Sequence, residues 1–392
     1  MSSTARVTVP ALESHAPQLA PPAVVVGLCA HGLATTRALT SAGVSVIAVE
    51  TDSRLPGFRT RLATVVRAGP INGPGLANTL VDLARRYAWP SRPVLFLMND
   101  KMVKEVAENW GRLAPYYRIS WEASRDTVLR LQSKNNLPDV CAANGVKVPA
   151  TVDYEGEQDG AAVLERVPFP AIVKPALPMG GFKAVIARSL QDIVQLARRH
   201  ATSLPFVVQQ WIPGGPTTLR FCNLFLDRGT PIARFDGRKA WAGPDGMGQG
   251  TVMEPYPDER VYQASLQLVK GLELTGPLAV EFKQDASGQL WLIEPNVGRT
   301  EYCLDVCVSN GVNFPYIEYA YVIGRELPPV RMQNRRVWFD TDRDPFAWLR
   351  FLLTRGPDPR ALRPVFPYLH LRDTGPFFAS CRTMFARLFS RG

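Results

Sequence analysis

The residues with the clearest chemical meaning lie between positions 278 and 296. This segment reads LAVEFKQ, then the turn-forming quartet DASG, then QLWLIEPN, and two apolar runs around a turn predict a β-hairpin. If Asp285 pairs with Gly288 across the turn, Glu281 stands opposite Leu292. A loop with one residue more or fewer would reverse which side chains share a face.

Alternation along the two strands places several polar side chains on one face of this hairpin. They are Glu281, Lys283, Glu294 and Asn296. Two carboxylates beside a carboxamide are an unfavourable arrangement unless something neutralises them. Hard oxygen ligands at this density suit Mg²⁺, which proteins bind through one or two carboxylates together with substrate phosphates. The competing interpretation is a hairpin whose polar side faces solvent.

Strands and helices alternate in the first part of the chain. Apolar runs lie at residues 23–29, 44–50, 64–66 and 94–98, and helical patterns lie at residues 32–42 and 75–89. Continuous apolar strands that alternate with helices predict a parallel sheet covered on both faces. The fold class expected for this region is therefore α/β.

Polar residues at the carboxyl ends of these strands are candidate substrate contacts, because the mouth of a parallel sheet forms there. They are His31, Gly32, Asn99 and Asp100. The turn over residues 27–32 also joins a strand to a helix, where backbone N–H groups can bind an anion. It lacks the GxGxxG spacing of a dinucleotide site. The alternatives are a tight turn that needs two glycines, and a histidine that belongs to the turn or the surface.

After residue 134 the pattern changes to short strands with frequent turns. The expected strands cover residues 149–154, 171–175, 183–188, 206–212, 219–226 and 231–240, with helices at about 189–200 and 258–273. Pro- and Gly-rich turns at residues 213–216 and 244–246 favour antiparallel connections. This region is therefore expected to be α+β.

The composition fits a globular chain of two to three domains. Its 392 residues are 46% hydrophobic and 20% charged, with a formal net charge of +10. No apolar run approaches the roughly 18 residues of a membrane span, and no secretory signal is evident. We therefore expect a cytoplasmic protein whose six cysteines are reduced thiols. Cys303 and Cys307 are interpreted as buried helical thiols, because no other His or Cys completes a metal site.

The positive charge is concentrated near the C-terminus. Residues 330–392 contain 12 Arg, no Lys and 5 Asp, whereas the preceding 329 residues carry a net charge of +3. Aromatic residues are frequent here, and residues 346–353 and 377–389 have amphipathic helical patterns. The segment packs back on the body, docks on a protein or an anionic membrane surface, or binds nucleic acid. No nucleic acid is expected, because Arg is mixed with Asp and no known motif is present.

Taken in order, these segments resemble the ATP-grasp superfamily, and within it carboxylate–amine ligases similar to D-aspartate ligase and to proteins of polysaccharide loci. The resemblance spans roughly residues 23–330, and no Walker A motif is present. It implies an ATP-grasp fold preceded by a parallel-sheet, Rossmann-like domain. The implied division is a disordered arm at 1–22, the preceding domain at 23–125, the ATP-grasp domain at 126–330 and an extension at 331–392. Within the ATP-grasp domain, a lid covers about 135–212 and a larger subdomain about 213–330.

The resemblance assigns nucleotide contacts to matching residues. They are Lys134, Lys174, Gly180, Gly181, Lys183, Gln209, Gln210, Trp211 and Ile212. The lysines would meet phosphates, the glycines would let a loop close over them, and the hinge residues would hold adenine. Gln209 departs from the family's usual acidic residue, and residues 216–218 lack the carboxylate that often holds the ribose.

Metal and catalytic roles are implied in the same way. Glu281, Glu294 and Asn296 match the metal ligands, and Arg299 and Lys183 match cations that stabilise transferring groups. Arg299 follows the metal segment with one residue more than usual. Arg238 and Lys239 are candidates for binding a substrate carboxylate, with a solvated strand end as the alternative.

The implied reaction joins a carboxylate to an amine. The carboxylate attacks the γ-phosphate of ATP to give an acyl phosphate and ADP, and the amine then displaces phosphate. ATP and Mg²⁺ are the implied cofactors, and amino acids, amino sugars or short peptides are the implied substrates. A homodimer is a possible assembly. The first alternative is a non-catalytic nucleotide-binding regulator or scaffold that docks through its tail. The second is a dinucleotide-dependent enzyme.

Overall fold

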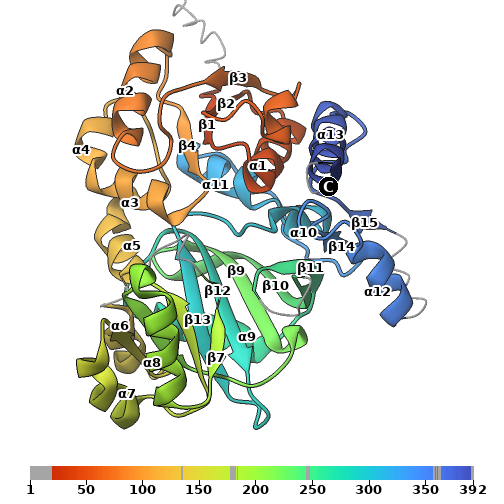
Figure 1. Cartoon of the computed structure of the whole chain (residues 1–392). Coiled ribbons are helices and arrows are strands. Elements are labelled where there is room, and N and C mark those ends of the chain that lie inside the picture. The colour runs from red at the N-terminus through yellow and green to blue at the C-terminus, as the bar shows by residue number, and fades with distance from the viewer. Residues whose placement is uncertain are drawn as a thin grey trace, which may run out of the picture.

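The computed structural model describes residues 20–133, 136–176, 182, 184–243, 248–355, 358, 360 and 363–389. These residues form three sheets with helices packed on them (Figure 1). The first sheet has four parallel strands, the second has four antiparallel strands, and the third has seven strands and forms the central body. This arrangement confirms the expected combination of α/β and α+β structure.

The parallel sheet is built from the apolar runs of the first part of the chain. Its order is β3-β2-β1-β4, with β1 (Ala23–Val26), β2 (Val46–Glu50), β3 (Thr64–Arg67) and β4 (Val94–Leu97). The helices around it are α1 (Ala30–Ser41), α2 (Leu76–Tyr87), α3 (Asp100–Glu108), α4 (Trp110–Leu113) and α5 (Arg125–Gln132). Every residue of β1 and β4 is buried, as in a sheet covered on both faces.

A carboxylate occupies the turn between β1 and α1. Glu50 is buried, and its Oε2 accepts the N–H of Leu28 at 2.7 Å while its Oε1 accepts two further backbone N–H groups at 2.7 and 3.0 Å. Gly32 is needed for close packing, because a Cβ there would lie 1.8 Å from the carbonyl oxygen of Gly27. Within the turn over residues 27–32, the N–H of Leu28 is therefore already held by an acidic side chain, and anion binding by the rest of the turn stays a prediction.

The second sheet lies at the lower left of Figure 1, within the residues expected to form a lid, and this region is called the lid below. Its order is β5-β8-β6-β7, with β5 (Thr151–Tyr154), β8 (Phe206–Gln210), β6 (Ala171–Pro175) and β7 (Val185–Ala187). Helices α7 (Gly160–Arg166) and α8 (Leu190–Arg199) pack on it, whereas α6 (Leu137–Ala143) buries Val140 and Cys141 in the core shared by the first and third sheets. Helix α8 begins at a capping box, in which Ser189 and Asp192 bond each other's backbone N–H groups.

The central sheet has the order β13-β12-β9-β10-β11-β14-β15. Its first five strands are β9 (Leu219–Asp227), β10 (Thr230–Ala242), β11 (Gly250–Pro255), β12 (Gly276–Gln284) and β13 (Leu290–Val297). Helix α9 (Glu259–Leu268) packs on the face that carries Cys222. Helices α10 (Leu304–Ser309) and α11 (Phe314–Ile323) pack on the face that carries Phe221 and Phe235.

The β12–β13 hairpin has a different register from the one predicted. Asp285 pairs with Gln289, because its N–H bonds the carbonyl oxygen of Gln289 at 3.0 Å, so the loop holds one residue more. Gly288 in this loop has a φ of +87°, as in a three-residue hairpin with a glycine bulge. As a result Leu292 pairs with Phe282 rather than with Glu281, and both are buried on the α9 face.

A β-bulge restores the predicted grouping of polar side chains. The register shifts between Glu281 and Phe282, so that Glu281 pairs directly with Glu294. Ile293 is the extra residue on β13. Glu281, Glu294 and Asn296 therefore share one face, although the turn alone would have separated them.

The C-terminal segment packs back on the body, as one of the three interpretations predicted. Strand β14 (Val337–Phe339) pairs with β11 and with β15 (Pro364–Val365), and the segment also contains α12 (Ala347–Arg355) and α13 (Gly375–Phe389). Buried Asp373 accepts hydrogen bonds from Arg37 Nε at 3.1 Å and from Thr60 Oγ1 at 2.9 Å. No helix in the described part of the chain is long and apolar enough to cross a membrane.

Candidate active site

Two carboxylates stand side by side at the centre of the site. Glu281 on β12 faces Glu294 on β13, and Lys239 on β10 donates to Glu281 Oε1 at 2.7 Å. Desolvation in the crowded site, followed by repulsion from Glu281 and Glu301, raises the pKa of Glu294 to about 7. A carboxyl group held this close to other carboxylates needs either a proton or a cation.

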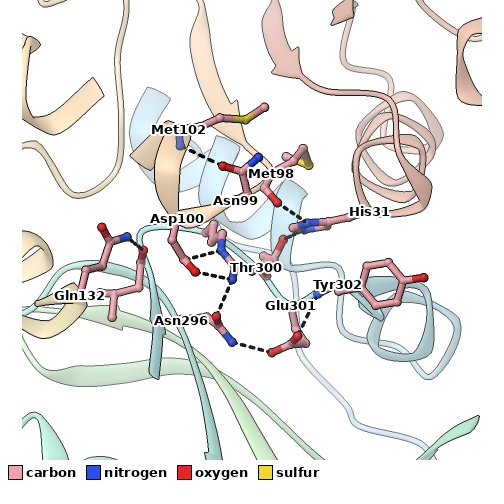
Figure 2. A network of polar contacts seen from close by, with 12 residues as sticks. His31, Met98, Asn99, Asp100, Met102, Gln132, Asn296, Thr300, Glu301 and Tyr302 are labelled. Carbon is pink, nitrogen blue, oxygen red and sulfur yellow. Dashed lines mark hydrogen bonds and ion pairs between the residues drawn. The ribbon is translucent and has the colours of Figure 1, made fainter. Parts of the chain in front are cut away.

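Asn296, near the end of β13, contacts two residues of the loop that follows this strand (Figure 2). Its Nδ2 donates to Glu301 Oε2 at 3.0 Å, and its Oδ1 accepts from Arg299. Arg299 in turn donates from Nε and Nη2 to the two oxygens of Asp100 at 2.6 and 3.1 Å. A continuous chain of hydrogen bonds thus runs from Asp100 of the parallel-sheet domain through Arg299 to the carboxamide of Asn296.

A second contact joins the two domains at His31. Its Nδ1 lies 3.3 Å from the carbonyl oxygen of Met98, and its Nε2 lies 2.7 Å from Thr300 Oγ1. A carbonyl oxygen only accepts, so Nδ1 carries the proton and Nε2 accepts the hydroxyl of Thr300. Burial, and then the charge of Arg299, lower the pKa of His31 to about 3, so the ring is neutral. His31 therefore links Met98 to Thr300 as a neutral ring, and it does not serve as a general acid.

Three lysine ammonium groups converge on the same region from three strands. Lys239 and Lys283 are buried, on β10 and β12, and Lys174 lies on β6 of the lid. Burial, followed by the nearby charges of Lys239 and Lys174, lowers the pKa of Lys283, and its Nζ lies 4.1 Å from the ring centre of Trp211. Of these three lysines, Lys239 is paired with the carboxylate of Glu281. Several ammonium groups in one place fit a bound polyanion such as a chain of phosphates.

Arg238 does not belong to this site. It pairs with Arg220 of β9, which in turn pairs with Phe282 of β12, so Arg238 lies on the α9 face. There its Nε donates to buried Glu254 at 2.7 Å and its guanidinium stacks on Tyr256. The expectation that Arg238 binds a substrate carboxylate is therefore wrong, because strand alternation turns Arg238 away from its neighbour Lys239.

The four residues expected to contact substrate have different positions. His31 and Asp100 lie at the domain junction, where they contact Thr300 and Arg299. Asn99 is the N-cap of α3, because its Oδ1 accepts the N–H of Met102 at 2.9 Å. Gly32 is buried inside α1, where it packs closely against the backbone of Gly27 rather than facing a substrate.

The predicted nucleotide contacts fall partly within the described residues. Gln209 donates from Nε2 to Thr151 Oγ1 at 3.0 Å, Gln210 accepts the N–H of Ala150 at 3.3 Å, and Ile212 is buried. These placements leave the predicted contacts with adenine as predictions. Lys134, Gly180, Gly181 and Lys183 lie outside the described residues.

Glu301 is a site residue that the sequence reasoning missed. Its Oε2 accepts from Asn296 and its Oε1 accepts the N–H of Tyr302 at 3.1 Å. Burial raises its pKa, and the charge of Arg299 partly offsets this effect. The sequence feature that could have identified Glu301 is its position two residues after Arg299, a residue already assigned a catalytic role.

The oxygen ligands present fit a divalent cation that is shared with a ligand. Glu281 and Glu294 supply paired carboxylates, and burial followed by the charges of Glu281 and Glu301 raises the pKa of Glu294 to about 7. Among the described residues, no group of three or more His, Cys, Asp or Glu side chains could hold a metal ion. This donor set suits Mg²⁺, which keeps few protein ligands and binds substrate phosphates.

Comparison with known proteins agrees with this geometry. The chain is 24% identical over 280 residues to D-aspartate ligase from Enterococcus faecium, a match that covers 65% of this chain and 66% of that protein. It therefore spans just under two thirds of that relative's length. No family model matches the chain.

Solved structures show the same fold. N5-carboxyaminoimidazole synthetase from Staphylococcus aureus, solved with ADP, has a TM-score of 0.61 at 15% identity, covering 80% of this chain and 81% of that one. The biotin carboxylase domain of 2-oxoglutarate carboxylase from Hydrogenobacter thermophilus, solved with MgADP, ADP and bicarbonate, has a TM-score of 0.63 at 15% identity. That match covers 82% of this chain and 74% of the domain. The chain therefore has the ATP-grasp fold. In this ATP-grasp protein the paired glutamates, the converging lysines and Arg299 meet where the lid, the central sheet and the parallel-sheet domain come together.

Proposed function

We propose that this ATP-grasp protein is a carboxylate–amine ligase that forms an amide bond through an acyl phosphate and releases ADP and phosphate. The observation that carries the proposal is the pairing of Glu281 with Glu294 beside the ammonium groups of Lys174, Lys239 and Lys283. An amino-acid ligase among its relatives supports a small carboxylate and an amine as substrates.

The roles of individual residues follow from charge and position. Glu281, Glu294 and Asn296 would hold Mg²⁺, which would supply positive charge that bridges phosphate oxygens. The three lysines would offset the remaining phosphate charge and hold the nucleotide in line with the substrate carboxylate. Arg299, held by Asp100, would stabilise negative charge that develops on the transferring group.

The direct test replaces one paired glutamate. We expect Glu294→Gln to keep the fold, because Gln has the shape of the protonated carboxyl group, and to lower ADP formation by about a hundred- to a thousand-fold. Coupled-enzyme detection of ADP measures the rate. Glu259→Gln, which changes an exposed glutamate on α9, is the matched control and should retain wild-type activity.

The substrate pair is found by measuring ADP release over pooled amino acids, amino sugars and short peptides, with mass detection of products. An amide product that depends on ATP supports the proposal. Binding of Mg·ATP without ADP release across the whole panel would instead favour a nucleotide-binding scaffold. Wild-type turnover by Glu294→Gln would contradict the metal assignment.

A further inference from the structure

The C-terminal extension, residues 331–389, has an unusual surface for a segment that is well packed on its inner side. Among the described residues, eight of the eleven large hydrophobic side chains that are exposed lie in this extension. They are Phe346, Trp348, Leu349, Leu353, Leu369, Leu371, Phe378 and Phe385. Packing against the body therefore accounts for one side of the extension and leaves its outer side apolar.

On α12 these side chains form a stripe. Phe346, which directly precedes α12, and Leu349 and Leu353 within it are 68%, 49% and 77% exposed, and their spacing of three and four residues places them on one side of the helix. Ala347 and Phe351 point the other way, into the core beside β14. A helix of a monomeric protein usually turns polar residues outward, so this outer stripe requires an explanation.

Helix α13 also has exposed apolar side chains on one side, with an exposed arginine between them. Phe378 and Phe385 are exposed and lie seven residues apart, which places them on the same side, and exposed Arg382 lies between them. Leu369 and Leu371, just before this helix, are also exposed. Both helices lie on the right side of the molecule in Figure 1, away from the lid.

The exposed charges of the extension have a single sign. Asp340, Asp344 and Asp373 are buried and bonded to arginines, and neither remaining aspartate belongs to the exposed residues. The charged side chains that are exposed in its described part are all arginines: Arg331, Arg335, Arg336, Arg343, Arg363, Arg372 and Arg382. In the folded extension no aspartate is exposed in the described part, whereas seven arginines are exposed on the same segment as the apolar side chains.

We propose that this face binds the surface of an anionic lipid bilayer, with the stripes of α12 and α13 inserted among the acyl chains and the arginines on headgroup phosphates. Guanidinium groups bind phosphate oxygens in pairs, and aromatic and aliphatic side chains flanked by cations are typical of interfacial helices. Two copies of this face would bring like charges together, so charge disfavours self-association through it. A bilayer needs charge complementarity and apolar insertion without a shaped pocket, which agrees with outward-facing stripes.

Vesicle sedimentation tests the proposal on the full chain. We expect binding to phosphatidylcholine vesicles that contain about 30% phosphatidylglycerol, little binding to pure phosphatidylcholine, and release when salt rises from about 0.05 to 0.5 M. The combined substitution Phe346→Ser, Leu349→Ser and Leu353→Ser should weaken partitioning at least about ten-fold. The combined substitution Arg363→Gln, Arg372→Gln and Arg382→Gln should weaken it roughly a hundred-fold.

Matched controls come from other parts of the surface. Leu164→Ser alters an exposed leucine on α7 of the lid, and Arg85→Gln with Arg166→Gln and Arg199→Gln removes three exposed arginines outside the extension. Both should bind vesicles like the wild type, and circular dichroism with thermal melting confirms that every variant folds. Glu294→Gln should also bind like the wild type, which keeps this proposal separate from the proposed ligase activity.

Three results would overturn the proposal. The first is an absence of wild-type binding to anionic vesicles at low salt. The second is an equal loss of binding in the control variants, which would indicate non-specific attraction. The third is a wild-type dimer in analytical ultracentrifugation that the triple serine variant converts to a monomer, which would assign the face to a second copy of the chain.

Discussion

Asp100 holds the guanidinium of Arg299 from a different domain. Both oxygens of Asp100 accept hydrogen bonds from Arg299, which also donates to Asn296. A planar guanidinium bonded in this way has a defined orientation. Asp100 is therefore a positioning residue: it sets where the charge of Arg299 stands relative to the paired glutamates.

Removing that orientation has a measurable cost. We expect Asp100→Asn to lower the rate of ADP formation about ten- to a hundred-fold, because a shift of Arg299 by about an ångström misplaces its charge. The melting temperature should change little, since Asp100 is half exposed. Asp52→Asn, which loosens the exposed pair with Arg54 in the same domain, is the matched control. Equal rates for both variants would contradict a positioning role.

Glu318 predicts a pH dependence of stability. Its buried carboxyl group accepts the hydroxyl of Ser120 at 2.6 Å, and burial raises its pKa to about 8. An unfolded chain loses this proton near the ordinary value of 4.5, whereas the folded chain keeps it to about 8. Between these values the folded state binds more protons, so the free energy of unfolding falls as pH rises.

Glu318→Gln should remove that slope. Each unit of raised pKa corresponds to about 1.4 kcal/mol, so the variant should gain stability relative to the wild type at pH near 8 compared with pH near 5. Urea unfolding at both pH values measures the difference. Glu326→Gln, in which the changed residue is exposed just after α11, should follow the wild type. Parallel pH profiles for wild type and Glu318→Gln would refute the prediction.

At the scale of elements, the β12–β13 hairpin shows how two irregularities can cancel. The loop holds one residue more than predicted, which reverses the side-chain parity, and the bulge at Ile293 reverses it again. Glu281 and Glu294 meet because both irregularities are present. Bulges occur next to active sites because they redirect side chains in this way.

Deleting Ile293 tests the bulge. The apolar pairs near the turn should keep their register, because they are buried, while Glu294 and Asn296 rotate to the opposite face. We expect loss of Mg·ATP binding by calorimetry, with native secondary structure by circular dichroism. Ile293→Val keeps the bulge and should bind like the wild type. Retained binding by a folded deletion variant would argue against the assigned metal face.

At the scale of the whole molecule, the C-terminal extension is part of the fold. Arg37 and Asp373 form a buried ion pair across more than 300 positions of sequence, and Arg360 reaches Glu254 on β11 at 2.9 Å. Asp340 bonds Tyr302, which directly follows Glu301. The extension thereby ties the parallel-sheet domain to the strand and loop that border the site.

Breaking the Arg37–Asp373 pair should destabilise the whole chain. We expect Asp373→Asn to lower the free energy of unfolding by about 3–5 kcal/mol, because it leaves a buried guanidinium without its counter-charge. Thermal and urea unfolding measure the loss. Glu157→Gln, which breaks an exposed pair with Arg198, should cost less than about 1 kcal/mol. Similar small losses in both variants would show that the extension is only loosely attached.

Local pattern was enough to predict much of this protein. Apolar runs and turn residues indicated the parallel sheet and the hairpin, because each depends on residues close in sequence. The ATP-grasp fold was implied by the resemblance of several segments, in order, to that superfamily. Glu281 and Glu294 were predicted to share one face of the hairpin, although by a register that the structure replaces.

Tertiary structure decided what no local pattern carries. Strand alternation placed Lys239 in the site and Arg238 outside it, and a bulge brought Glu281 opposite Glu294. Domain packing brought Asp100 and His31 to residues about 200 to 270 positions away. Glu301 joined the site through its contact with Asn296 and through its charge near Glu294. The amino-acid sequence by itself determined which elements form and which charges they carry. The tertiary structure decided which charges meet, because such contacts depend on the register and packing of segments that are distant along the chain.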